Sequence, residues 1–66
     1  MIEITFYYLK VDGNWYRGTK NFNDTEKAIR FIYKCLRSSK LVFSGEINCE
    51  DDYDLEIIRH RFGYNF

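Results

Sequence analysis

The residue types that most often carry enzyme chemistry are scarce in this chain. His60 is the only histidine among 66 residues, and its neighbours Arg59 and Arg61 are typical of a cationic helix end. A general base needs a positioned partner and a cleft, and the sequence indicates neither beside His60. We therefore expect His60 to have a structural role at the end of a helix.

The two cysteines and one acidic run are the other groups that suggest metal or redox chemistry. Cys35 and Cys49 form no C-x-x-C pair and, with a single histidine, do not complete a four-ligand zinc site. We expect them to be small buried hydrophobic residues without a disulfide. The run Glu50–Asp52 lacks the spacing of oxygen ligands and the central glycine of a calcium loop. No phosphate-binding glycine loop or nucleophile motif occurs either, so we predict a protein that is not an enzyme and that uses no cofactor or metal ion.

The charged residues cancel in total but are sorted along the sequence. Residues 17–40 contain seven basic and two acidic residues, whereas residues 41–56 contain six acidic residues and no Lys or Arg. This sorting predicts one positive and one negative face, each a candidate surface for a partner. The basic candidates recur at helical spacing and are Lys27, Arg30, Lys34 and Arg37. The acidic candidates are Asp51, Asp52 and Asp54, which also suit the first turn of a helix.

Two N-terminal strands, over residues 2–10 and 15–22, are predicted from the alternation of apolar and polar side chains. A three-residue loop between them puts Gly13 in the left-handed conformation that such loops require. This register sets Tyr8 opposite Tyr16 and keeps apolar side chains on matching faces. A two-residue loop would instead set apolar residues of the first strand opposite polar residues of the second.

The second half of the chain indicates a helix, a strand and a second helix. The main helix is predicted over residues 24–38, with Asn23 as its capping residue. A strand over residues 41–49 follows, in which Gly45 suggests a bulge or a close backbone approach. Residues 52–62 predict a short C-terminal helix, and a fourth strand is the alternative for this segment.

The order ββαβα predicts a single small α+β domain spanning residues 1–66. We expect a three-stranded, mainly antiparallel sheet with the main helix packed on one face and a short C-terminal helix. The expected core consists of Ile4, Phe6, Tyr8, Ile29, Ile32, Leu36, Phe43, Ile47 and Leu55.

One helical layer leaves the second face of such a sheet uncovered. The side chains expected on this aromatic face are Tyr7, Leu9, Trp15 and Arg17, joined by Val42 if the third strand lies alongside. A contiguous exposed apolar patch usually marks an interaction site, and Tyr, Trp and Arg are enriched at binding hot spots. The alternative is that the C-terminal segment, with Phe62, Tyr64 and Phe66, folds back over this face.

These surfaces predict a protein-binding module. We expect it in the cytoplasm, because the sequence shows neither a secretory signal nor an apolar run of roughly 18 residues. The expected partner is another protein, with a homodimer as one form of it. The aromatic face is the expected binding site. In the alternative, Asp51, Asp52 and Asp54 imitate the phosphates of a nucleic acid and occupy the nucleic-acid-binding groove of a partner protein. A nucleic-acid-binding protein that uses the basic helix over residues 27–37 is the second hypothesis, although the pI near 6.5 and the acidic block oppose it.

The short, proline-free and aromatic-rich chain resembles the small accessory proteins of phages and other mobile elements of Gram-positive bacteria. This resemblance is one of composition and rests on no motif. It implies an inhibitor that acts by binding a host protein.

Overall fold

The computed structural model describes residues 1–63 and contains three strands and two helices. These are β1 (Ile2–Leu9), β2 (Trp15–Phe22), α1 (Thr25–Arg37), β3 (Leu41–Cys49) and α2 (Asp52–Arg61). The sheet order is β2-β1-β3 and both strand pairs are antiparallel. The predicted ββαβα fold is therefore confirmed, and the C-terminal segment is a helix rather than a fourth strand.

The β1–β2 hairpin has the predicted three-residue loop. Lys10 N–H donates to the Asn14 carbonyl over 3.1 Å, and Gly13 N–H donates to the Lys10 carbonyl over 3.0 Å. Gly13 has a φ of +84°, the left-handed conformation that favours glycine. The pairs Leu9–Trp15 and Tyr8–Tyr16 lie in the predicted register. Side-chain alternation thus fixed both the loop length and the face on which each residue lies.

Each helix begins at an aspartate whose side chain accepts a backbone hydrogen bond. Asp51 caps α2 and accepts from Tyr53 N–H over 2.9 Å. Asp24 caps α1 and accepts from Glu26 N–H over 3.0 Å. The expectation that Asn23 caps α1 is therefore wrong by one residue. A carboxylate at the cap also interacts favourably with the positive end of the helix dipole, which an Asn side chain does less well.

The core lies between α1 and the sheet, with one residue of α2. Its buried apolar residues are Ile2, Ile4, Ala28, Ile29, Phe31, Ile32, Cys35 and Ile58. Three of the predicted core residues are in this set, Ile4, Ile29 and Ile32. Another five are half-buried, and they are Phe6, Tyr8, Phe43, Ile47 and Leu55.

Leu36 was wrongly predicted to be a core residue, because its side chain is 61% exposed. It lies on the side of α1 that faces α2. On that side the structure has an ion pair from Glu26 to Arg61 and a ring contact from Tyr33 to Phe62. Leu36 is beyond both contacts, toward the end of α1, so α2 does not cover it.

The middle of β3 contains the bulge that Gly45 suggested. The pairing with β1 passes from Ile4–Ile47 to Phe6–Phe43, so three residues of β3 face the single residue Thr5. Gly45 has a φ of +87° at this point. The Ser44 hydroxyl donates to the Thr5 carbonyl over 2.7 Å and accepts from Glu46 N–H over 3.1 Å, which replaces strand hydrogen bonds that the bulge removes.

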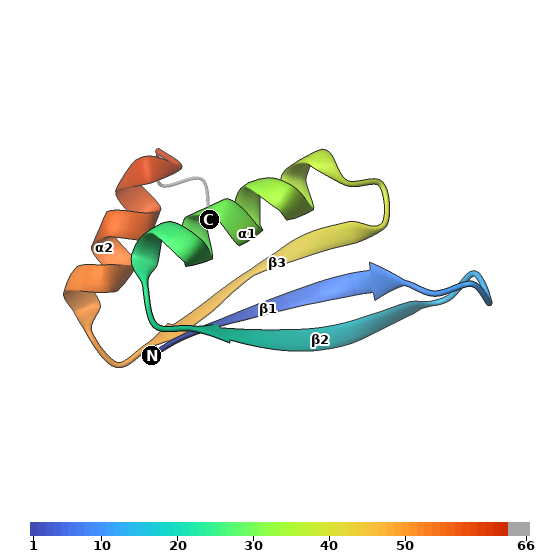
Figure 1. The fold of residues 1–66 in the computed structure, drawn as a ribbon, viewed down its shortest axis with the longest axis horizontal. Coiled ribbons are helices and arrows are strands. Elements are labelled where there is room, and N and C mark those ends of the chain that lie inside the picture. The colour runs from blue at the N-terminus through green and yellow to red at the C-terminus, as the bar shows by residue number, and fades with distance from the viewer. Residues whose placement is uncertain (64–66) are drawn as a thin grey trace.

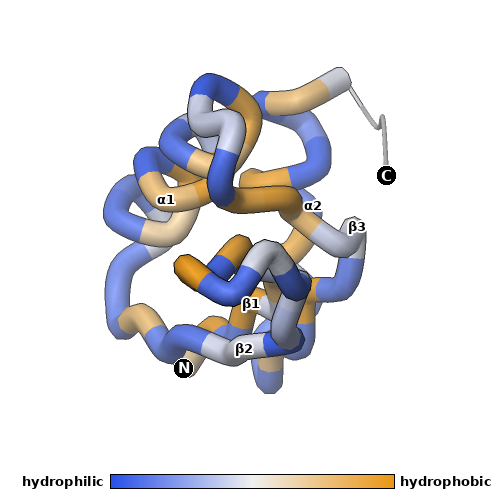
Figure 2. Tube along the Cα trace, turned by 90° about the vertical axis from the view of Figure 1, so that its right-hand side faces the viewer, coloured by the Kyte–Doolittle hydropathy of each residue, from blue (hydrophilic) through white to orange (hydrophobic). Residues whose placement is uncertain are grey.

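The two helices lie on the same side of the sheet (Figures 1 and 2). The described chain places no helix or strand on the other side of the sheet. Figure 1 also shows that the β1–β2 hairpin extends past the helical layer, so the molecule is long, with extents of 39 × 21 × 16 Å. We call the uncovered side of the sheet the open face.

Candidate functional site

The residues of the predicted aromatic face lie next to one another on the open face. Leu9 is directly opposite Trp15, and Tyr7 lies between Arg17 of β2 and Val42 of β3. Tyr7, Trp15 and Val42 are 38%, 46% and 48% exposed, while Leu9 is half-buried. Because odd-numbered residues of β1 and β2 point to this side, one strand pair supplies most of the patch.

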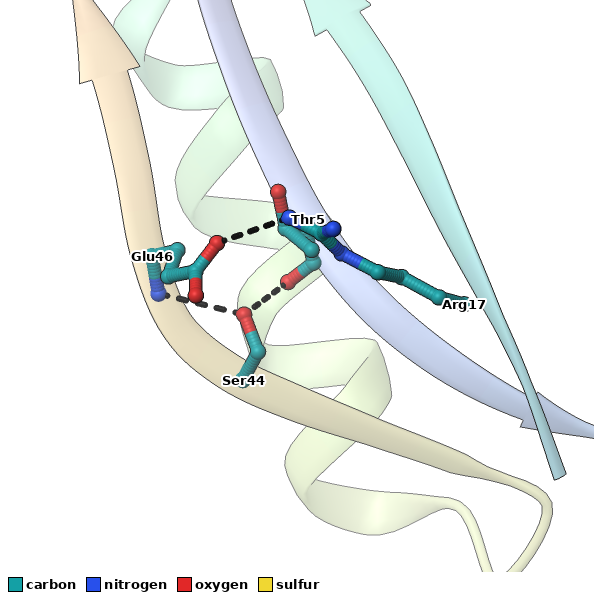
Figure 3. Close-up of polar contacts among 4 residues, drawn as sticks. All are labelled: Thr5, Arg17, Ser44 and Glu46. Carbon is teal, nitrogen blue, oxygen red and sulfur yellow. Dashed lines mark hydrogen bonds and ion pairs between the residues drawn. The ribbon is translucent and has the colours of Figure 1, made fainter.

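Arg17, the charged member of the aromatic face, is held in place from across the sheet. Its side chain reaches over β1, and its Nη2 forms an ion pair with Glu46 Oε2 at 3.1 Å (Figure 3). Thr5 of the central strand lies beneath this bridge and is buried, with 5% exposure. Both charged side chains remain mostly in solvent, so we attribute to the pair an orienting effect on Arg17 rather than much stability.

Glu46 was not among the predicted site residues. Its place opposite Arg17 depends on the bulge, which brings Glu46 to the level of Thr5. The glycine in the middle of a predicted strand was the one signal in the sequence that could have indicated this shift.

The alternative in which the C-terminal segment covers the open face is wrong for Phe62. The Phe62 ring packs on Tyr33 of α1, with the ring centroids 4.7 Å apart, and so lies in the helical layer. Tyr64 and Phe66 lie outside the described residues.

The two charged candidate sets are on different sides of the molecule. Lys27 and Lys34 are on the same side of α1 as Phe31, because they precede and follow it by about one turn. The Phe31 ring contacts Phe22 at 5.5 Å, which places this side of α1 over β2. The acidic residues Asp51, Asp52 and Asp54 begin α2, which packs beside β3 at the opposite edge. Arg30 and Arg37 are exposed on the outer surface of α1.

The hairpin also carries aromatic and basic side chains on its other side. Lys10 Nζ lies 4.4 Å from the centroid of the Tyr16 ring, and Lys20 Nζ lies 5.3 Å from that of Phe31. Gly18 is opposite Phe6, and a Cβ at Gly18 would come within 3.0 Å of the Phe6 ring. The absence of a side chain there allows the Phe6 ring to approach the backbone of β2 closely.

A polar pocket of about 490 Å³ occupies the other end of the open face. It is lined by Thr5, Arg17, Thr19, Glu46, Asn48, Leu55 and Arg59, among others. Arg59 Nε is buried there and has no hydrogen-bond partner among residues 1–63. Arg59 lies in the basic last turn of α2, as predicted, and its side chain also lines this pocket beside β3. Two arginines and the carboxylates of Glu3 and Glu46 balance in charge, so the pocket has no net attraction for an anion.

The two cysteines form no disulfide in the structure. Cys35 is buried and Cys49 is half-buried, and burial raises the pKa of both thiols above the usual value. Within residues 1–63, no group of three or more His, Cys, Asp or Glu side chains is arranged to hold a metal ion. His60 is exposed in the last turn of α2. None of the described helices is long and apolar enough to cross a bilayer.

No protein-family model, curated protein or solved structure matches this chain.

Proposed function

We propose that this protein is a non-enzymatic binding module that captures another protein on its aromatic face. One observation carries the proposal: Tyr7, Leu9, Trp15 and Val42 form a continuous apolar patch on a sheet face that no described element covers. Small proteins bury large aromatic side chains where they can, since each buries roughly 150–250 Å². Exposed aromatic residues gathered on one face are therefore typical of an interaction surface.

The patch also has the composition and rigidity of a binding hot spot. Trp, Tyr and Arg are the residues most often found at hot spots, and Trp15, Tyr7 and Arg17 lie side by side here. The patch sits on paired strands, and the bridge to Glu46 orients Arg17 before any partner binds. Less side-chain freedom is then lost on binding, which favours affinity. From the compositional resemblance, we take the partner to be a host protein that is inhibited in the cytoplasm.

The test compares two exposed aromatic residues on different sides of the molecule. Wild-type protein, Trp15→Ala and Tyr53→Ala are immobilised and exposed to lysate of the source cell, and captured proteins are identified. Tyr53 of α2 is the matched control, because it is 71% exposed and lies away from the open face. We expect a specific partner to be retained by Tyr53→Ala and weakened by about thirtyfold or more in Trp15→Ala, a loss typical of a hot spot. A partner whose capture is the same for both variants would contradict the aromatic face as its site.

A second copy of the chain is one form of protein partner that this face can accept. A two-fold dimer would bury Tyr7, Leu9 and Trp15 against the same residues of the other copy, since such an interface is self-complementary. Light scattering at high micromolar concentration tests this form. A mass near 8.1 kDa, that of the monomer, would contradict it.

Nucleic-acid binding remains the second candidate, and one observation favours it. Lys20 of β2 and Lys27 and Lys34 of α1 lie on one side of the molecule, and the acids of α2 lie at the opposite edge of the sheet. A polyanion could follow the basic side without meeting the acids. Binding of this kind would weaken by about 0.7–0.9 log units per log unit of salt for each phosphate contacted, and a flat salt dependence would exclude it.

A further inference from the structure

The outer side of β2 is a free sheet edge. In the order β2-β1-β3, no described element pairs with the outer side of the eight residues Trp15–Phe22, which include no proline. The opposite edge is different, because the bulge at Gly45 interrupts β3, and Leu55 and Arg59 of α2 line a pocket with it. An uninterrupted free edge is a template for an added strand, so β2 is the edge to consider.

The hydrogen-bond pattern shows which backbone groups of β2 are available. Lys10 and Asn14 are a hydrogen-bonded pair, and bonded pairs alternate along an antiparallel ladder. The even-numbered residues of β2 therefore bond to β1. The odd-numbered residues direct both N–H and C=O groups outward, and they are Trp15, Arg17, Thr19 and Asn21. Contacts of β1 agree, since odd-numbered Leu9 donates to Lys40 beside β3 and odd-numbered Thr5 accepts from Ser44 of β3.

The surroundings of this edge are basic. β2 contains Arg17 and Lys20 and no acidic residue. Lys20 lies on the α1 side, with its Nζ near the Phe31 ring, and Lys27 and Lys34 flank Phe31 on α1. None of these three lysines forms an ion pair with a residue in the described part of the chain. An added strand would thus have three unpaired cations on one of its faces and Trp15 on the other.

The same charges argue against a second copy at this edge. Two β2 strands paired antiparallel would each bring Lys20, which has no ion-pair partner among residues 1–63, to a strand that also has no acid, and like charges across strands are destabilising. The acids at positions 52, 54 and 56 are part of a helix, and Glu3 and Glu46 are in strands that already pair within the sheet. The edge therefore fits a different chain of opposite charge.

We propose that the outer edge of β2 binds an extended acidic segment of a partner protein as a fourth strand. Because side chains alternate along a strand, the segment would present acids to Lys20, Lys27 and Lys34 and apolar residues beside Trp15. The backbone groups of the odd-numbered residues of β2 would supply the hydrogen bonds. This inference rests on the proposed function, and it specifies the chemistry of the protein that the aromatic face helps to capture.

The first test uses the full chain and a capped synthetic peptide of alternating Glu and Val, about nine residues long to match a strand of ordinary length. Amide hydrogen exchange is followed by NMR. Near saturation we expect the amide protons of Arg17, Thr19 and Asn21 to exchange about tenfold more slowly, while those of the even-numbered residues change little. A peptide of alternating Lys and Val is the control. Equal binding of both peptides, or no protection at the odd-numbered residues, would overturn the proposal.

Two pairs of variants separate backbone pairing from charge. Thr19→Pro removes an outward N–H without removing a bond to β1, and Thr19→Val keeps that N–H. Lys20→Glu with Lys27→Glu reverses charge beside the edge, and Arg30→Glu with Arg37→Glu makes the same change in net charge on the outer surface of α1. We expect Thr19→Pro, and Lys20→Glu with Lys27→Glu, to lower the affinity for the Glu–Val peptide by about tenfold or more. The matched control variants should bind the peptide as the wild-type protein does. Unchanged affinity in Lys20→Glu with Lys27→Glu overturns the proposal even if Thr19→Pro does not fold.

The remaining outcomes distinguish this inference from the proposed function. A captured partner that is lost in Trp15→Ala and retained in Thr19→Pro would overturn the edge site and leave the aromatic face standing. A partner lost in Thr19→Pro and retained in Trp15→Ala would support the edge site and contradict the aromatic face. Tight, salt-sensitive binding of oligothymidylate, with no binding of the Glu–Val peptide, would overturn the proposed binding of an acidic strand and would indicate a nucleic acid as the partner.

Discussion

Truncation of Ile32 and truncation of Leu36, two side chains of equal size on α1, should differ widely in their cost to stability. Ile32 is fully buried, while Leu36 is mostly exposed. Ile32→Ala removes three buried carbon atoms, worth about 0.8 kcal/mol each, and leaves a cavity, so a loss of about 2–5 kcal/mol is expected. The better helix propensity of Ala returns only a few tenths of a kcal/mol.

Leu36→Ala is the matched control on the same helix. It removes the same number of carbon atoms from a side chain that keeps most of its surface in water, so we expect a cost below about 1 kcal/mol. The whole stability of a chain of 66 residues is about 3–10 kcal/mol. Ile32→Ala therefore brings the protein close to unfolding, and Leu36→Ala does not.

The assay is urea unfolding followed by circular dichroism. With an m-value of about 1 kcal/mol/M for a small domain, Ile32→Ala should lower the midpoint by about 2 M or more and Leu36→Ala by less than about 1 M. Ile32→Val, expected to cost about 0.5–1.5 kcal/mol, gives a measurable shift if the alanine variant is unfolded at the start. Equal midpoints for the two alanine variants would refute the orientation of α1 on the sheet.

Three further predictions concern side chains outside the main core. The hydrogen bond from the Tyr16 hydroxyl should hold the pKa of Asp12 below its ordinary 3.8, and an NMR titration should show a higher pKa in Tyr16→Phe. Because the pKa is lowered in the folded protein, this hydrogen bond stabilises the fold above pH 3.8, and the stabilisation is lost as the pH falls. The buried Cys35 thiol, whose pKa is raised by burial, should react with a thiol reagent far more slowly in the native protein than in urea. Ser44→Ala should cost about 1–3 kcal/mol in a thermal melt, since it leaves a buried carbonyl without its donor, whereas Ser39→Ala in the exposed turn should stay within about 0.5 kcal/mol.

The parts of the fold that were predictable are those set by local pattern. Alternation in the first two strands admits one register that keeps apolar side chains on matching faces, and Gly13 supplies the conformation that its loop requires. Acids before the second helix and bases in its last turn favour a helix over a strand. These signals act over a few residues, so they can be read without knowing what packs where.

The parts that were not predictable depend on contacts between distant elements. Leu36 has the spacing of a core residue, and its exposure follows from where α2 meets α1. Glu46 reaches Arg17 because of a bulge whose size the sequence did not specify. Arg59 has the place of a residue that stabilises the end of a helix, yet its Nε is buried beside β3. In each case tertiary packing decides between roles that the local sequence allows equally.

The charge sorting shows how a sequence pattern acquires a meaning only in the fold. The acids of residues 51–54 have a sufficient structural reason, because Asp51 caps α2 and the others lie in its first turn. The lysines at positions 20, 27 and 34 cap no helix and form no ion pair within residues 1–63, although Lys20 lies over the Phe31 ring. The order β2-β1-β3 brings them together from a strand and a helix along an uncovered edge, and α2 lies at the opposite edge. Cations without an ion-pair partner among residues 1–63, gathered beside outward-facing backbone groups, are the part of the pattern that folding alone does not require. The double variant Lys20→Glu with Lys27→Glu tests this distinction directly. It should leave the unfolding midpoint nearly unchanged and should lower the affinity for the acidic Glu–Val peptide.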